Sequence, residues 1–120
     1  MTDIQTREDL HLLMSEFYKK LLGDSKISFI FTQIAKIDLE PHLLDLVDFW
    51  EQILFDRGSY QKNVMQIHLD LNQQSKLSEE HFAIWLHYFN TTIDKNFAGQ
   101  IAENMKTRAL SIASVMKIKM

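Results

Sequence analysis

The chain has 120 residues, of which 46% are hydrophobic and 24% are charged, and its formal net charge is −3. This length predicts one domain, residues 1–120, and the composition is typical of a globular protein rather than of a disordered chain or a membrane protein. The absence of cysteine excludes disulfides and thiol catalysis, and the scattered lysines and arginines do not form the basic patch of a nucleic-acid-binding protein.

The spacing of apolar residues predicts an all-α domain. One proline and three glycines interrupt the chain, and most apolar residues recur every three or four positions. The polar, acidic start of the chain lacks the basic and apolar parts of a secretory signal, so we expect a cytoplasmic protein. A first helix is expected at about 6–22, because Thr6 and Asp9 have the spacing of a capping motif and Gly23 follows its end.

The middle of the chain predicts two short helical segments around a longer helix. Residues 26–35 are expected to form one or two helical turns with Phe31 facing inward. Asp38 is placed to cap the longer helix and Gly58 to end it, and one wide face of that helix is apolar. Residues 61–71 predict a shorter helix that carries His68, and residues 72–76 predict a polar loop.

Two more helices complete the expected fold. Ser78 is placed to start a helix whose inner face carries Phe82, Trp85, Phe89 and Ile93. Gly99 precedes the last helix, whose apolar positions are Ile101, Met105, Ile112, Val115 and Met116.

Histidines and aromatic residues on separate helical segments suggest a planar cofactor. His68 lies eighteen residues after Trp50 and seventeen before Trp85, and His42 lies eight residues ahead of Trp50. Tyr18, at the end of the first segment, adds a phenol that can meet an indole and an imidazole around one ligand. These residues predict a small haem protein, and because cysteine is absent the haem would be held without a covalent bond.

The same residues resemble a truncated haemoglobin of the third group. The resemblance runs from about residue 10 to residue 112, and the Gly-Gly motifs of the first two groups are absent, as is usual for the third. Between its tyrosine and its proximal histidine the family often has glycine and proline, where this chain has Lys62 and Val64. The residues that carry the resemblance are Phe17-Tyr18, Phe31, His42, Phe49-Trp50, Tyr60, His68-Leu69-Asp70-Leu71 and Trp85-Leu86.

This resemblance implies a fold, a cofactor and a set of site residues. Truncated haemoglobins fold as a two-over-two helical sandwich around haem, so the resemblance implies a globin-like domain that binds haem b. His68 aligns with the proximal iron ligand, and Tyr18, His42 and Trp85 align with the distal residues. The remaining residues expected to contact the cofactor are Phe31, Leu46, Phe49 and Trp50.

Each of these residues also has a purely structural interpretation. A histidine on a half-apolar helix is more often a packing residue than a ligand, and a tryptophan at helical spacing is more often core. Taken together, however, the residues favour His68 as the ligand of five-coordinate iron and Tyr18 as a hydrogen-bond donor to a bound gas. His42 can donate to that gas, gate its access or bind iron itself. Arg57 and Lys62 are candidate partners of the haem propionates, or simply surface charges.

The expected function is reversible binding of dioxygen, with nitric oxide, carbon monoxide and peroxide as related ligands. The alternative is a haem enzyme, a nitric oxide dioxygenase or a peroxidase-like enzyme that works with a cellular reductase, because the same donors can polarise an oxygen–oxygen bond. A helical interaction domain without a cofactor is the third interpretation, since aromatic stripes alone are also typical of a core. No nucleic acid and no membrane span is expected.

Overall fold

A computed structural model describes residues 1–34, 36–56 and 77–119 of the chain. These residues contain no strand and confirm the all-helical class. Within them, no helix is both long and apolar enough to cross a membrane. The expected helix at 61–71 and loop at 72–76 lie outside the described residues. The helices are α1 (Arg7–Leu22), the π-helix η1 (Ile30–Ile34), α2 (Leu39–Phe55), α4 (Glu79–Asn96) and α5 (Gln100–Lys119).

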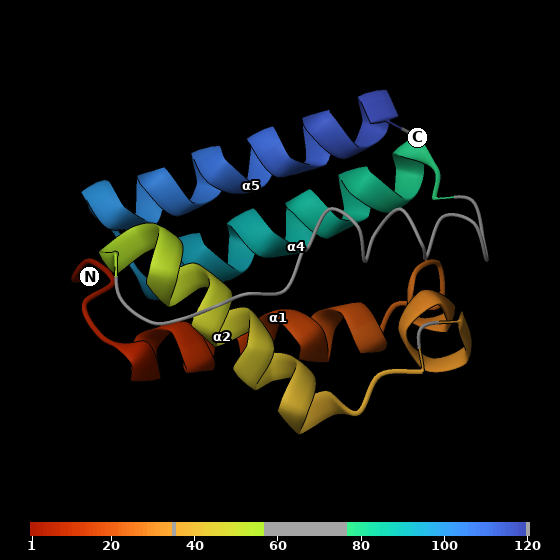
Figure 1. Ribbon diagram of the computed structural model, residues 1–120, viewed down its shortest axis with the longest axis horizontal. Coiled ribbons are helices and arrows are strands. Elements are labelled where there is room, and N and C mark those ends of the chain that lie inside the picture. The colour runs from red at the N-terminus through yellow and green to blue at the C-terminus, as the bar shows by residue number, and fades with distance from the viewer. Residues whose placement is uncertain (35, 57–76, 120) are drawn as a thin grey trace.

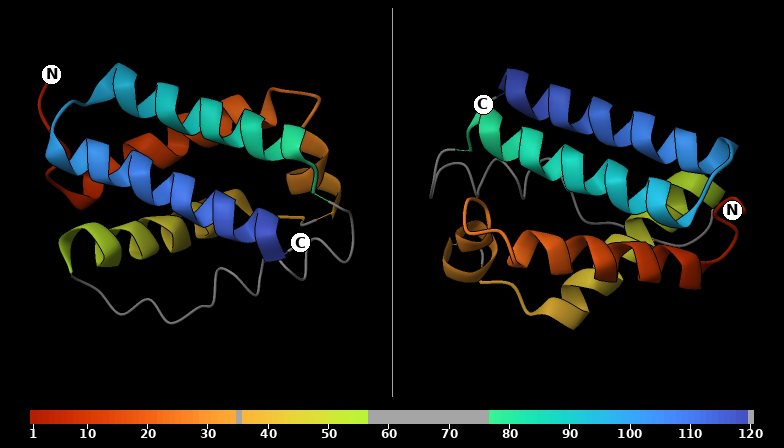
Figure 2. Two further views of the ribbon diagram at one scale, coloured as in Figure 1. Left: turned by 90° about the horizontal axis from the view of Figure 1, so that it is seen from above. Right: turned by 180° about the vertical axis from the view of Figure 1, so that it is seen from behind.

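The long helices are arranged as two pairs (Figure 1). α4 and α5 lie side by side and run in opposite directions, and α2 crosses α1 in the other pair (Figure 2). α1 contacts both α2 and α4, so it joins the two pairs. The largest fully buried side chains come from both pairs and form a shared core, which includes Leu10, Leu13, Phe17, Leu43, Phe89, Ile93 and Met105.

The expected signals at the ends of the helices are confirmed for α1 and only in part for α2. Thr6 Oγ1 accepts a hydrogen bond from the backbone N–H of Asp9, and the Asp9 carboxylate accepts one from the N–H of Thr6. Asp38 holds the first position before α2, but its side chain makes no capping hydrogen bond. α2 ends at Phe55 rather than at Gly58, because Asp56 takes the left-handed conformation, with φ of 54°, that ends a helix.

α5 packs on the core partly through small side chains, which the spacing of large apolar residues does not predict. The prediction that Val115 lies on the inner face is wrong, because its side chain is 41% exposed. The buried positions of this helix include three alanines, Ala102, Ala109 and Ala113, besides the expected Met105 and Met116. A methyl side chain lets the helix backbone approach its neighbours closely, so the periodicity of large apolar residues misplaced Val115 and did not find the alanines.

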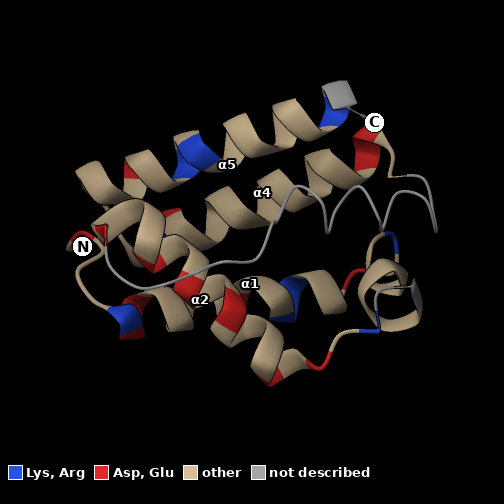
Figure 3. Cartoon of the chain, viewed as in Figure 1, with Lys and Arg blue, Asp and Glu red and all other residues tan. Residues whose placement is uncertain are grey.

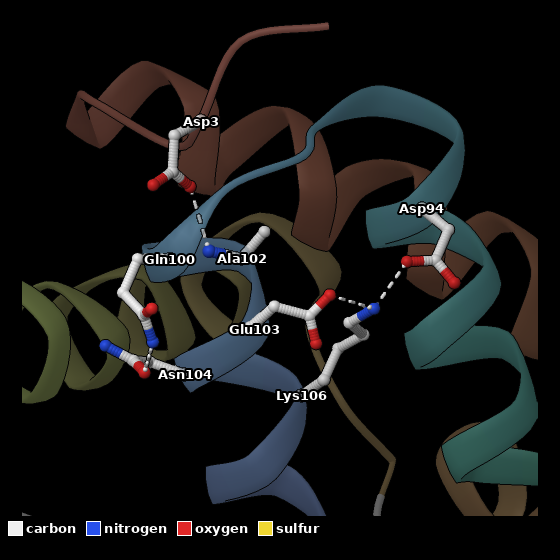
Figure 4. Close-up of polar contacts among 7 residues, drawn as sticks. All are labelled: Asp3, Asp94, Gln100, Ala102, Glu103, Asn104 and Lys106. Carbon is white, nitrogen blue, oxygen red and sulfur yellow. Dashed lines mark hydrogen bonds and ion pairs between the residues drawn. The ribbon is translucent and has the colours of Figure 1, made fainter.

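The N-terminal segment caps α5 (Figure 4). Asp3 accepts hydrogen bonds from the backbone N–H groups of Ile101 and Ala102, 2.8 and 2.9 Å away, and from that of Ile4 at 2.8 Å. Burial by itself raises the pKa of Asp3, but these three N–H groups outweigh it and lower the pKa below its ordinary value. Asp3 therefore supplies the cap that Gly99, which has no side chain, cannot supply.

Charged side chains connect the helices at the surface. α2 carries four acidic residues and no lysine or arginine, as its red positions in Figure 3 show. Arg7 of α1 binds two of them, Asp48 at 2.7 Å and Glu51 at 3.1 Å, and so ties the start of α1 to the second half of α2. On the other pair, Lys106 of α5 binds Asp94 of α4 at 2.7 Å (Figure 4).

Candidate functional site

A cavity of about 260 Å³ lies between the helices, with walls contributed by α1, η1, α2, α4 and α5. Its volume approaches the range of roughly 300–1,000 Å³ that is usual for ligand pockets. Aliphatic and aromatic side chains form most of the wall. The predicted site residues in this wall are Tyr18, Phe31, His42, Leu46, Phe49, Trp50 and Trp85.

The structure thus brings together every predicted site residue that it describes. His68, predicted as the iron ligand, lies outside the described residues, as do Tyr60, Arg57 and Lys62. Within the described ranges, no three histidine, cysteine or acidic side chains gather as a metal-binding group.

A hydrogen-bonded pair, Tyr18 and His42, provides polar groups in the cavity wall. Tyr18 Oη lies 2.7 Å from His42 Nε2, and the two rings meet edge to face with centroids 5.0 Å apart. The side chain of Tyr18 is 4% exposed and also packs edge to face on Phe17 and Phe31. These contacts from α1, η1 and α2 fix the position of the phenol.

The chemistry of this pair depends on where its protons lie. Burial raises the pKa of Tyr18 well above its ordinary value, so the phenol stays protonated at neutral pH. If Nε2 of His42 carries no proton, the phenol donates to it. If Nε2 carries a proton, the imidazole donates to the phenol oxygen, and the phenol hydrogen is then available to a ligand in the cavity. The tautomer of His42 therefore decides whether the phenol hydrogen of Tyr18 is available to a ligand in the cavity.

Trp85 and Trp50 belong to an aromatic cluster that is at once core and cavity wall. Trp85 stacks on Phe89, with centroids 5.1 Å apart and ring planes 22° apart, and it meets Phe17 edge to face at 5.6 Å. Trp50 packs on Phe89 of this cluster, with ring centroids 5.4 Å apart. These tryptophans can therefore be core residues and still line the cavity, because one part of an indole can pack while another part faces the cavity.

A ladder of hydrogen bonds sets how α1 lies against α4. Its three rungs recur at intervals of four residues on both chain segments, so the two helices are antiparallel and in register. Asp24 lies just beyond the end of α1, where the hydroxyl of Tyr88 donates to it at 2.7 Å and lowers its pKa. This register places Tyr18 and Trp85 on the walls of one cavity. The rungs are Glu16 with Asn96, Lys20 with Thr92, and Asp24 with Tyr88.

Several cavity residues were not predicted from the sequence. Met14 precedes Tyr18 by one helical turn and His81 precedes Trp85 by one turn, so helical periodicity could have found both. Phe82 and Met116 were expected only as core residues, and they also line the cavity. His81 has no ligand-like spacing in the sequence, yet the structure gives it two hydrogen bonds with Ser78 in the cap of α4.

Comparisons with known proteins agree with this geometry. No protein-family model matches the chain. The chain is 30% identical over 111 residues to the group 3 truncated hemoglobin ctb of Campylobacter jejuni, and the alignment covers 90% of this chain and 85% of that protein. Its fold is similar to the crystal structure of the group III truncated hemoglobin from Campylobacter jejuni, with a TM-score of 0.86 and 26% identity over 99% of this chain and 94% of that one. The chain therefore belongs to the group 3 truncated haemoglobins.

Proposed function

We propose that this chain binds haem b in the cavity and reversibly binds dioxygen and related diatomic gases there. The observation that carries the proposal is the convergence of Tyr18, His42 and Trp85, from three helices, on one largely apolar cavity. The names of the relatives, which are truncated hemoglobins, support a haem cofactor. When bound, haem would supply an iron atom with one open position for a gas.

The residues of the cavity fit such a cofactor. Aromatic and aliphatic walls suit a flat, largely apolar ring, and the chain has no cysteine that could attach the ring covalently. Phe31, Leu46, Phe49 and Trp50 would pack against it. His68 is proposed as the iron ligand, since an imidazole nitrogen is the usual ligand of globin iron.

The polar residues of the cavity would hold the gas. The phenol of Tyr18 keeps its proton and lies in a buried place, where a hydrogen bond to a partly negative oxygen is stronger than it is in water. His42 Nε2 can accept a hydrogen bond from the phenol or donate one to the phenol oxygen, so His42 decides whether the phenol is free to donate to the gas. The indole N–H of Trp85 can only donate. Two donors to one gas ligand, Tyr18 and Trp85, favour retention over rapid release.

Absorption spectra of purified protein with added haemin test the proposal. We expect a Soret band in the wild type. The ferrous spectrum of the His68→Ala variant should differ from that of the wild type, and added imidazole should restore the wild-type spectrum. The matched control is His87→Ala, because His87 is exposed on α4 and does not line the cavity. A well-folded protein that takes up no haemin would overturn the proposal and favour an interaction domain.

The enzymatic alternative uses the same side chains. The described geometry offers donors for a bound gas, and we therefore propose the binding role. Sustained turnover of nitric oxide or peroxide with a reductase would establish the enzyme instead. A protein that binds dioxygen but does not cycle would leave the binding role in place.

A further inference from the structure

His81 has an unusual place in the cap of α4. Ser78 Oγ accepts a hydrogen bond from the backbone N–H of His81 at 3.2 Å, and His81 Nδ1 accepts one from the backbone N–H of Ser78 at 3.1 Å. In this reciprocal cap the third helical residue is usually a glutamate or a glutamine, whose oxygen accepts the second bond. Here an imidazole nitrogen takes the place of that oxygen.

This cap fixes the tautomer of His81. A nitrogen that accepts a hydrogen bond carries no proton, so the proton of the neutral ring must lie on Nε2. The ring is also held from the side, because it meets Phe29 edge to face with centroids 5.7 Å apart. His81 therefore presents an N–H donor in a fixed orientation, whereas most half-exposed histidines can exchange tautomers freely.

The fixed ring of His81 forms part of the cavity wall. It is half-buried, while Tyr18 is 4% exposed, and it lies in the first turn of α4, one turn before Trp85. The positive end of the α4 dipole favours negative charge at this turn. Among the described residues, the charged groups near this turn are Glu79 and Glu80, both exposed, and Lys26, whose Nζ lies 3.9 Å from Glu80. His81 is a hydrogen-bond donor in an apolar cavity wall near solvent, so it suits an acceptor at the edge of a molecule bound in the cavity.

We propose that His81, through Nε2–H, binds a carboxylate of the molecule that occupies the cavity. The inference rests on the proposed function, in which that carboxylate is a propionate of haem. The cap then has two roles, because it starts α4 and it orients the donor. His81 is a binding residue for the cofactor and takes no part in binding the gas.

Replacing the carboxylates and the histidine in turn tests the proposal. The wild type and the His81→Ala variant are each loaded with haemin or with its dimethyl ester, which lacks free carboxylates. The rate of porphyrin loss to excess apomyoglobin is then followed through the Soret band. We expect His81→Ala to speed haemin loss about threefold to tenfold, as for a charged hydrogen bond partly screened by solvent, and to change loss of the diester by less than about twofold.

Two further variants separate binding from capping. Ser78→Ala removes the other half of the cap and leaves the imidazole in place, so we expect it to affect both porphyrins equally. His81→Gln keeps an acceptor for the cap and an N–H donor, and we expect a rate of haemin loss near that of the wild type.

The outcomes distinguish this inference from the proposed function. If His81→Ala speeds the loss of both porphyrins equally, His81 only caps the helix and the inference is wrong. If the wild type takes up neither porphyrin, both the inference and the proposed function are wrong.

Discussion

The substitution Tyr18→Phe removes one hydroxyl from the cavity and leaves the packing around it intact. The benzene ring keeps its edge-to-face contacts with Phe17 and Phe31, and the volume of the side chain changes little. What is lost is the hydrogen bond to His42 at 2.7 Å in the free protein and the donor to a bound gas. Because the phenol is protonated at neutral pH, its hydrogen is present in the wild type and can bind the gas whenever it does not bind His42.

The size of the effect follows from two opposing hydrogen bonds. A buried, charge-assisted hydrogen bond contributes about 1.5–3 kcal/mol, and an ordinary one about 0.5–1.5 kcal/mol. If the phenol leaves His42 in order to donate to dioxygen, the net stabilisation of the bound gas is about 1–2 kcal/mol. Since about 1.4 kcal/mol corresponds to a factor of ten, Tyr18→Phe should speed dioxygen release roughly fivefold to thirtyfold.

Stopped-flow displacement of dioxygen by carbon monoxide measures this rate. The matched control is Tyr88→Phe, which removes the same hydroxyl from a tyrosine that does not line the cavity. This control loses one rung of the ladder between α1 and α4 and keeps the other two, Glu16 with Asn96 and Lys20 with Thr92. We expect the control to release dioxygen at the wild-type rate. Release from Tyr18→Phe that stays within about twofold of the wild type would show that the phenol does not hold the gas.

Three further predictions concern stability, each measured by urea unfolding. Asp3→Ala should lower the free energy of unfolding by about 1 kcal/mol at pH 6. The pKa of Asp3 is lower in the folded protein than its value of about 3.9 in the unfolded chain, so the carboxylate stabilises the fold above that value. This stabilisation is lost as the pH falls through the folded-state pKa, and the difference between wild type and variant should therefore shrink near pH 3. Gly99→Ala should destabilise by about 1–3 kcal/mol, since φ is +151° and a Cβ there would collide with Asp3; an effect below that of Asp3→Ala would contradict this. Lys20→Met should destabilise by about 1 kcal/mol, because the buried hydroxyl of Thr92, 1% exposed, loses its donor, while the exposed Lys19→Met should have no effect.

Much of the helical framework follows from the sequence because its signals are local. The capping motif of Thr6 and Asp9, the placement of Ser78 before α4 and the recurrence of apolar residues all act within a few residues of the chain. These signals predicted the bounds of α1 and the starts of α4 and α5 closely. They misplaced the end of α2 and the inner position of Val115, because a left-handed Asp56 and a close approach through alanines are set by packing rather than by local preference.

The candidate site, too, could be predicted from the sequence only in part. The residue types around it, a phenol, imidazoles and indoles at helical spacing, could be read from the sequence together with the resemblance to truncated haemoglobins. The sequence could not show that Asp3 caps a helix that begins almost a hundred residues later, nor that His81 would close the cap of α4 with its own imidazole. Hydrogen bonds between distant segments form only when the helices pack, and no local spacing encodes them.

By itself, then, the sequence determined the helical class, most helix starts and the chemistry available to a site. Tertiary structure decided which of those groups meet. The 2.7 Å contact between Tyr18 and His42 exists because α1 and α2 cross, and the ladder of hydrogen bonds holds α1 in register on α4. A helix specifies its own faces through a repeat of 3.6 residues, but the faces that come together depend on burying the most apolar surface of the whole chain.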